Sequence, residues 1–242
     1  LFVHAPDQES YNDLTQENGL AKPMKGGIPR PRVPANCRGI APYEISPADP
    51  TRILQRPSRS PTLTRIDPAK LRIVKYPDPR LRKTCRPVVT FDDWLANVVR
   101  RMTTLMHDSA GVGLAAPQVG LPLRMFVCNV TGHHNDDFVY LNPRLTDHQD
   151  LVEGDEGCLS IPDATVTVRR HRACTMHAQD LTGKPFESRA SGLLARCWQH
   201  EYDHLDGRLI VDLMSEADKI ANRRLLKQLE SDYRAAKPVR AR

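Results

Sequence analysis

The stretch QHEYDHLDG, residues 199–207, decides how this sequence folds and what it can bind. Apolar residues recur at helical spacing just before it, which predicts a largely buried helix over residues 191–205. In such a helix His200 and His204 lie one turn apart on the same face, so both imidazoles can bind a single metal ion. Glu201, next to the first histidine, can then act as a general base toward a water on that metal.

A catalytic site of this kind needs a third protein ligand and one open position. The metzincin signature is excluded, because it requires a histidine where this chain has Ile210. A downstream carboxylate, Glu216 or Glu230, would give a thermolysin-like site. The upstream stretch EGCLS, residues 156–160, offers a better ligand in Cys158, because a thiolate with two imidazoles suits Zn²⁺ or Fe²⁺.

A third segment, GVGLAAPQ at residues 111–118, follows a helix predicted from Asp92 or Asp93 to about Asp108. Its two glycines and two alanines allow an extended peptide to lie against the backbone. Gln118 supplies an uncharged amide donor. The glycine spacing matches neither a phosphate loop nor a dinucleotide-binding loop.

The folded part is expected to begin near Lys70. Helices are predicted over residues 92–108, 191–205 and 215–233, and strands over 71–74, 125–130, 138–141, 166–168 and 173–178. Turns are predicted at 76–79 and 181–184. Because strands and helices do not alternate as βαβ units, the pattern predicts an α+β fold. Short antiparallel strands and hairpins would pack around a central metal-binding helix, with a further helix at the C-terminal end.

Composition separates the ends of the chain from its middle. The chain has 242 residues, and residues 1–69 hold 11 of the 20 prolines, so we expect a mostly irregular extension there. No apolar run exceeds four residues, which excludes a transmembrane helix and a secretory leader. We therefore expect a cytoplasmic protein without membrane contact, whose six cysteines stay reduced, buried or metal-bound.

The net charge of +6 is concentrated near the C-terminal end. Residues 219–242 carry eight basic residues against two acidic ones, so the rest of the chain sums to zero. A basic helix and tail of this kind could favour a polyanion such as RNA, or an anionic membrane. The alternative is a solvated helix face with a frayed end.

Together, the three quoted segments resemble the peptide deformylases. That family carries a glycine-rich segment ending in Ala-Ala-x-Gln, then Glu-Gly-Cys-x-Ser, then His-Glu-x-Asp-His, and this chain has all three in that order. The flanking stretches YPDPRLR at 76–82 and DGRL at 206–209 match as well. The resemblance covers about residues 70–233. It departs from the family at Thr165, where members often have an arginine, which puts any peptide contact there in doubt.

The resemblance implies a hydrolase that removes the formyl group from the N-formylmethionine of newly made polypeptides and releases formate. It implies a catalytic domain over residues 70–235, followed by a basic tail at 236–242. It also implies one divalent metal ion, Fe²⁺ with Ni²⁺, Co²⁺ or Zn²⁺ as substitutes, held by Cys158, His200 and His204.

The same resemblance implies roles for six further residues. Glu201 would be the general base. The side-chain amide of Gln118 and the backbone N–H of Leu159 would stabilise the oxyanion. The peptide backbone would pair with the remaining three residues, which are Val112, Gly113 and Gly157. The binding partner would then be the N-terminus of a nascent polypeptide. The basic helix within 219–242 resembles a helix that is linked to ribosome docking in this family. The protein is expected to be a monomer.

Two alternatives follow from the residues themselves. One is a metallo-endopeptidase, which would cleave inside peptides and use a carboxylate as third ligand. The other is a ribosome- or RNA-binding module with a structural metal, which rests on the basic segment 219–242. A structural site would be closed by four ligands.

Overall fold

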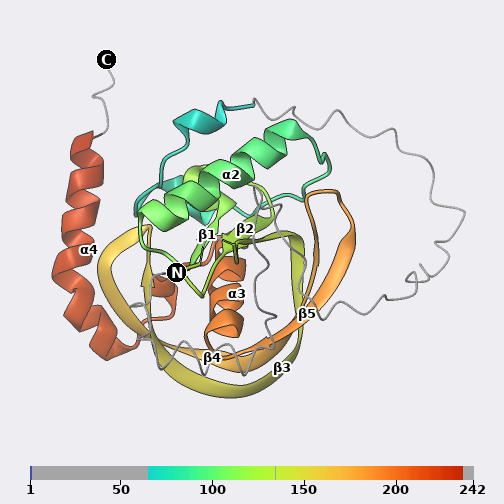
Figure 1. Cartoon of the computed structure of the whole chain (residues 1–242). Helices are drawn as coiled ribbons and strands as arrows, with labels where there is room; N and C mark the ends of the chain where they lie inside the picture. The colour runs from blue at the N-terminus through green and yellow to red at the C-terminus, as the bar shows by residue number, and fades with distance from the viewer. Residues whose placement is uncertain (2–64, 134, 237–242) are drawn as a thin grey trace, which may run out of the picture.

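The computed structural model describes Leu1 and residues 65–133 and 135–236. The extension predicted for residues 1–69 and the tail predicted for 236–242 therefore fall almost entirely outside the described residues. Within them the chain has the predicted α+β fold, with a five-stranded antiparallel sheet and three α-helices (Figure 1).

The sheet is an antiparallel meander in which each strand lies beside its neighbour in sequence. Its strands are β1 (Gly113–Ala115), β2 (Met125–Cys128), β3 (Phe138–Cys158), β4 (Ile161–Gln179) and β5 (Pro185–Ser191). In Figure 1 the long β3–β4 hairpin curves around α3 (Gly192–Leu205). Because β3 ends at Cys158, the tight turn of this hairpin carries a candidate metal ligand.

Each helix begins where the sequence predicts. Asp92 caps α2 (Asp93–Asp108), its side chain accepting a hydrogen bond from the backbone N–H of Leu95. α3 follows Ser191. α4 (Glu216–Ala236) begins with a reciprocal pair of hydrogen bonds between Ser215 and Asp218. Four 3₁₀ segments complete these elements: η1 (Pro68–Lys70), η2 (Pro79–Arg82), η3 (Ala116–Val119) and η4 (Ile210–Asp212).

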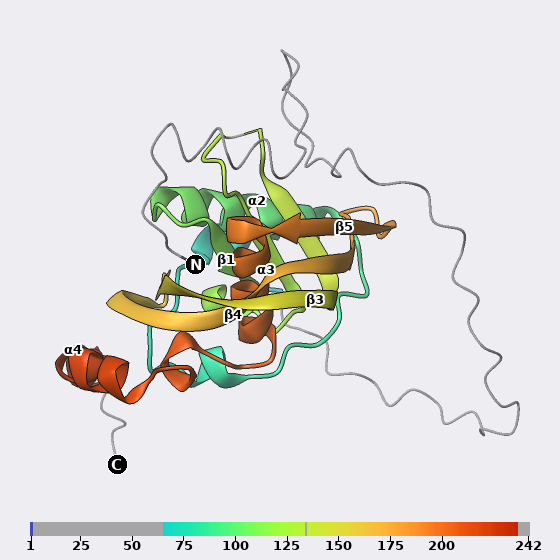
Figure 2. The same ribbon diagram turned by 90° about the horizontal axis from the view of Figure 1, so that it is seen from below.

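Apolar packing holds α3 at the centre. Figure 2 shows α3 in the middle of the molecule, with α2 beside it and α4 at the edge. Trp198 of α3 is fully buried and meets Tyr140 of β3 edge to face, at 5.5 Å between ring centres. Truncating such a buried tryptophan costs about 3–5 kcal/mol. This packing fixes the helix that carries the two site histidines.

The strand predictions were incomplete. Residues 71–74 do not form a strand, although the backbone N–H of Val74 donates to the carbonyl of Gln118 at 2.7 Å. The predicted pieces 138–141, 166–168 and 173–178 are parts of β3 and β4, and strands β1 and β5 were not predicted. The full length of β3 was missed because residues 147–153 are exposed on both faces, so no alternation of apolar and polar residues marks the strand there.

Among the described residues, none of the helices combines the length and the apolar character needed to cross a membrane.

Candidate metal centre

Three buried side chains meet at the candidate metal centre. α3 supplies His200 and His204, and the end of β3 supplies Cys158. One donor atom from each lies within 4.8 Å of the others, and the Cys158 Sγ is 3.4 Å from His204 Nε2. The predicted third ligand therefore lies beside the histidines, although 42 positions of sequence separate it from His200.

A carboxylate behind the centre orients His200. Glu156 is fully buried, and its Oε2 accepts a hydrogen bond from His200 Nδ1 at 2.9 Å. Arg170 donates to both oxygens of Glu156 at 3.0 Å, and Arg196 donates to Oε1 at 2.8 Å. Burial alone would raise the pKa of Glu156, but the hydrogen bonds from His200 and Arg170 hold this pKa well below its usual range. Glu156 thus stays charged and leaves the other ring nitrogen of His200 free as a ligand.

The donor set fits a divalent metal. His200 Nε2, the ring nitrogen that Glu156 leaves free, is buried without a hydrogen-bond partner, whereas buried polar atoms are nearly always paired. Burial also lowers the pKa of His204 well below its ordinary value, so this imidazole is neutral, the form that ligates metals. A thiolate with two imidazoles suits Zn²⁺ or Fe²⁺.

Leu1 lies beside the centre and contacts β1. The amino group of Leu1 donates to the carbonyl of Gly113 at 3.1 Å, and the Leu1 carbonyl accepts from the N–H of Val112 at 3.0 Å. Its side chain is fully buried in the same apolar cluster as Trp198. The Leu1 backbone therefore runs beside Val112 and Gly113 of the β1 edge.

Glu201 faces both this amino group and the centre. Its Oε1 accepts from the Leu1 amino group at 2.6 Å, and both groups are fully buried. Gly113 allows this close approach, because a Cβ there would lie 2.5 Å from Glu201 Oε1. A carboxylate in this position can exchange a proton with an amine at the end of a bound peptide.

Gln118 and Leu159 border the other side of the centre. Gln118 is fully buried, and its Nε2 lies 3.5 Å from Cys158 Sγ and 3.2 Å from Ser160 Oγ. Its Oε1 accepts from the N–H of Ala115 at 2.8 Å, which points the amide nitrogen toward the centre. Gly157, Cys158 and Leu159 line a cavity of about 710 Å³.

The structure brings all nine predicted site residues together around one centre, while their roles stay predictions. Sequence reasoning missed the group behind the centre, formed by Glu156, Arg170, Arg196 and Asp203, in which Arg170 joins Glu156 to Asp203. Glu156 and Asp203 lie inside the quoted segments EGCLS and HEYDH, so the sequence could have pointed to them as residues beside the metal ligands. Nothing in the local sequence pattern marked the two arginines.

Comparisons with known proteins agree on one family. The family model described as polypeptide deformylase matches residues 70–220. A peptide deformylase of Alkalilimnicola ehrlichii is 42% identical over 162 residues, which are 66% of this chain and 91% of that protein. A crystal structure of a peptide deformylase from Legionella pneumophila has 43% identity and a TM-score of 0.64, covering 69% of this chain and 99% of the other. A peptide deformylase from Plasmodium falciparum has 36% identity and a TM-score of 0.67, with the same coverage.

Proposed function

The chain belongs to the polypeptide deformylase family, and we propose that Cys158, His200 and His204 hold the divalent metal that this family uses. The protein is a hydrolase that removes the N-terminal formyl group from newly made polypeptides. Water is consumed, and formate and a free amino terminus are the products. The convergence of two histidines, a thiolate and Glu201 in one buried centre is the observation that carries the proposed site.

We propose Fe²⁺ as the native metal, with Ni²⁺, Co²⁺ or Zn²⁺ as substitutes. The donor set supports this assignment, because thiolate and imidazole suit Fe²⁺ as well as Zn²⁺. When bound, such an ion supplies Lewis acidity, which activates a water molecule and polarises the formyl oxygen.

The substrate enters as an extended chain along β1, in the position that Leu1 marks. Its backbone pairs with Val112 and Gly113 and passes Gly157 in the cavity opposite, as in strand addition to a sheet edge. The methionine side chain takes the apolar space that the Leu1 side chain fills.

Three groups of this chain act on the formyl carbon and its neighbours. Glu201 accepts the proton of the attacking water and passes it to the leaving nitrogen, which lies where the Leu1 amino group is 2.6 Å from Oε1. The amide of Gln118 and the N–H of Leu159 donate to the developing oxyanion. The position of Gln118 Nε2 beside Cys158 supports this role. Losing one such donor lowers the rate by roughly 10²–10³.

We also propose that residues 70–235 form the catalytic domain, that residues 236–242 are a basic tail, and that the enzyme works in the cytoplasm as a monomer. The family match over residues 70–220 supports the start of this domain. The packing of α4 against the domain supports its end, since Leu225, Leu226 and Leu229 join an apolar cluster with Cys158 and Ile210.

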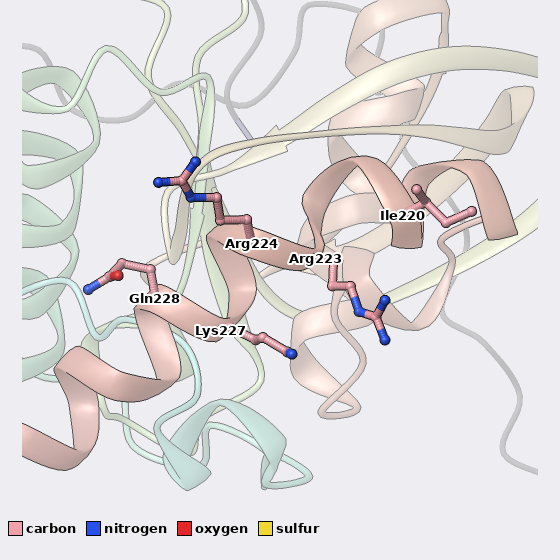
Figure 3. Close-up of a pocket in the computed structure, with 5 residues that line it drawn as sticks. All are labelled: Ile220, Arg223, Arg224, Lys227 and Gln228. Carbon is pink, nitrogen blue, oxygen red and sulfur yellow. The ribbon is translucent and has the colours of Figure 1, made fainter.

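We propose that the outer face of α4 docks the enzyme on the ribosome. Ile220, Arg223, Arg224, Lys227 and Gln228 line a shallow cavity there, and Figure 3 shows Arg223 and Lys227 extending to the same side of the helix. Ile220 is 76% exposed. Arg223, Arg224 and Lys227 are exposed cations on this part of α4, and such cations suit the phosphates of ribosomal RNA.

Formate release from a formyl-Met tripeptide tests the proposed activity and site. Protein loaded with Fe²⁺ without oxygen, or with Ni²⁺, should release formate, and metal-free protein should not. Folded, metal-loaded protein that released none would refute the proposal.

Charge reversal tests the docking separately. The triple variant R223E/R224E/K227E should lose cosedimentation with ribosomes while turnover of the tripeptide stays within about twofold. Unchanged cosedimentation would exclude α4 as the docking face.

A further inference from the structure

Residues 74–76 form hydrogen bonds with both chain segments that carry the proposed oxyanion donors, Gln118 and Leu159. The N–H of Val74 donates to the carbonyl of Gln118 at 2.7 Å, and the N–H of Tyr76 donates to the carbonyl of Ser160 at 2.8 Å. Between them, Lys75 Nζ donates to the carbonyl of Leu159 at 2.6 Å. Residues 74–76 therefore tie the segment that carries Gln118 to the hairpin turn that carries Leu159.

Of these three contacts, the one from Lys75 depends on a side chain. Lys75 lines the same cavity as Gly157, Cys158 and Leu159, and among the described residues lining this cavity it is the only lysine or arginine. Burial lowers the pKa of Lys75, while Cys158 and Asp163 oppose that shift. A cation thus spans the gap between two chain segments at the edge of the proposed substrate cavity.

We infer that Lys75 is a positioning residue for deformylation: it holds the Leu159 carbonyl, one peptide unit beyond the Leu159 N–H, and so fixes the hairpin turn that directs this N–H at the oxyanion. This inference rests on the proposed roles of Leu159 and Gln118. A donor to an oxyanion works only where it is held in place before reaction, and small displacements cost large factors in rate. The charged hydrogen bond from Lys75 fixes the Leu159 carbonyl, and with it the orientation of the hairpin turn.

The inference predicts a loss confined to the chemical step. In the metal-loaded enzyme, Lys75→Met should lower kcat about tenfold, the lower end expected for a supporting contact. KM for the formyl-Met tripeptide should stay within about twofold, because the Lys75 side chain bonds the Leu159 carbonyl and none of the three residues proposed to pair with the peptide, Val112, Gly113 and Gly157. Lys75→Arg keeps a cationic donor and should restore most of kcat. Lys83→Met, at an exposed lysine that does not line the cavity, is the matched control and should behave as the unmodified protein.

Metal content and melting temperature are measured alongside the kinetics. If Lys75 only positions the hairpin turn, Lys75→Met should change neither of them greatly. A kcat of Lys75→Met within twofold of the unmodified enzyme would overturn the inference. So would a rise in KM alone, which would make Lys75 a peptide contact. Equal losses in Lys75→Met and Lys75→Arg with a lower melting temperature would show a structural role instead. Absence of formate from the unmodified enzyme would refute the proposed function, and this inference with it.

Discussion

At the scale of single residues, the carboxylate of Glu201 is held beside the metal centre by the groups around it. It is fully buried, one oxygen faces the Leu1 amino group and the other has no hydrogen-bond partner. Replacing it by the isosteric glutamine removes the base without opening a cavity. We expect Glu201→Gln to keep its metal and to lose turnover by about 10²–10⁴, measured as formate release alongside metal analysis. Near-normal turnover in this variant would exclude Glu201 as the base.

Cys158 differs from the other buried cysteines because two histidines, His200 and His204, lie beside its thiol. Cys174 is equally buried but does not belong to the donor cluster. We expect Cys158→Ala to lose bound metal, because two imidazoles alone leave the site one ligand short. Metal per protein after desalting measures this, and Cys174→Ala is the matched control that should keep its metal. Unchanged metal content in Cys158→Ala would mean that another residue is the third ligand.

At the scale of elements, β1 can pack close to Glu201 because Gly113 has no side chain. A Cβ at Gly113 would lie 2.5 Å from Glu201 Oε1 and 2.8 Å from Cys197 Sγ. We expect Gly113→Ala to displace the Glu201 carboxylate and lower kcat at least tenfold. Gly111→Ala is the comparison, because its Cβ would meet the flexible end of Leu159 at 2.7 Å, and it should lose less activity. A larger loss in Gly111→Ala would contradict this explanation.

η4 is tied to η2 by one carboxylate. Asp212 pairs with Arg82 and accepts from the N–H of Leu209 at 2.9 Å. Burial alone would raise the pKa of Asp212, but these contacts lower it below the ordinary 3.8. A lowered pKa in the folded state means that the carboxylate contributes stability in full above pH 3.8 and loses it as the pH falls through the folded-state value.

The variant Asp212→Asn tests this linkage. Its free energy of unfolding should be lower than that of the unmodified protein by about 1 kcal/mol or less at pH 7, because solvent screens this partly exposed pair. Denaturant titrations at several pH values should show the difference shrinking below pH 3.8. A difference that grew on acidification would refute the assignment.

At the scale of the whole molecule, the proposed metal ion would link elements that are distant in the sequence. Cys158 lies at the turn of the β3–β4 hairpin, whereas His200 and His204 lie on α3. An ion bound only by the folded chain stabilises it, by about 2.7 kcal/mol at a free concentration 100 times Kd. We expect a chelator to abolish formate release and to lower the melting temperature, with both restored by Fe²⁺ or Ni²⁺. A melting temperature that did not respond to the metal would argue against the proposed ligands.

The sequence by itself determined the fold class and the three helices with their starting residues, and it placed His200 and His204 on one helix face, while the full set of candidate site residues came with the family resemblance. These features were readable because helical periodicity, caps and i, i+4 histidines are local patterns. The family resemblance then linked the three segments. The full length of β3 was not readable, because residues 147–153 in its middle are exposed on both faces.

Only the tertiary structure decided which distant groups support the site. Arg170 and Arg196 converge on Glu156 from a strand and a helix, Lys75 meets Leu159 across 84 positions, and Leu1 pairs with Val112 and Gly113. Each of these contacts joins residues that share no periodicity and no local motif. The two arginines reach Glu156 because the β3–β4 hairpin curves around a buried helix, and this arrangement depends on packing over the whole chain rather than on any short stretch.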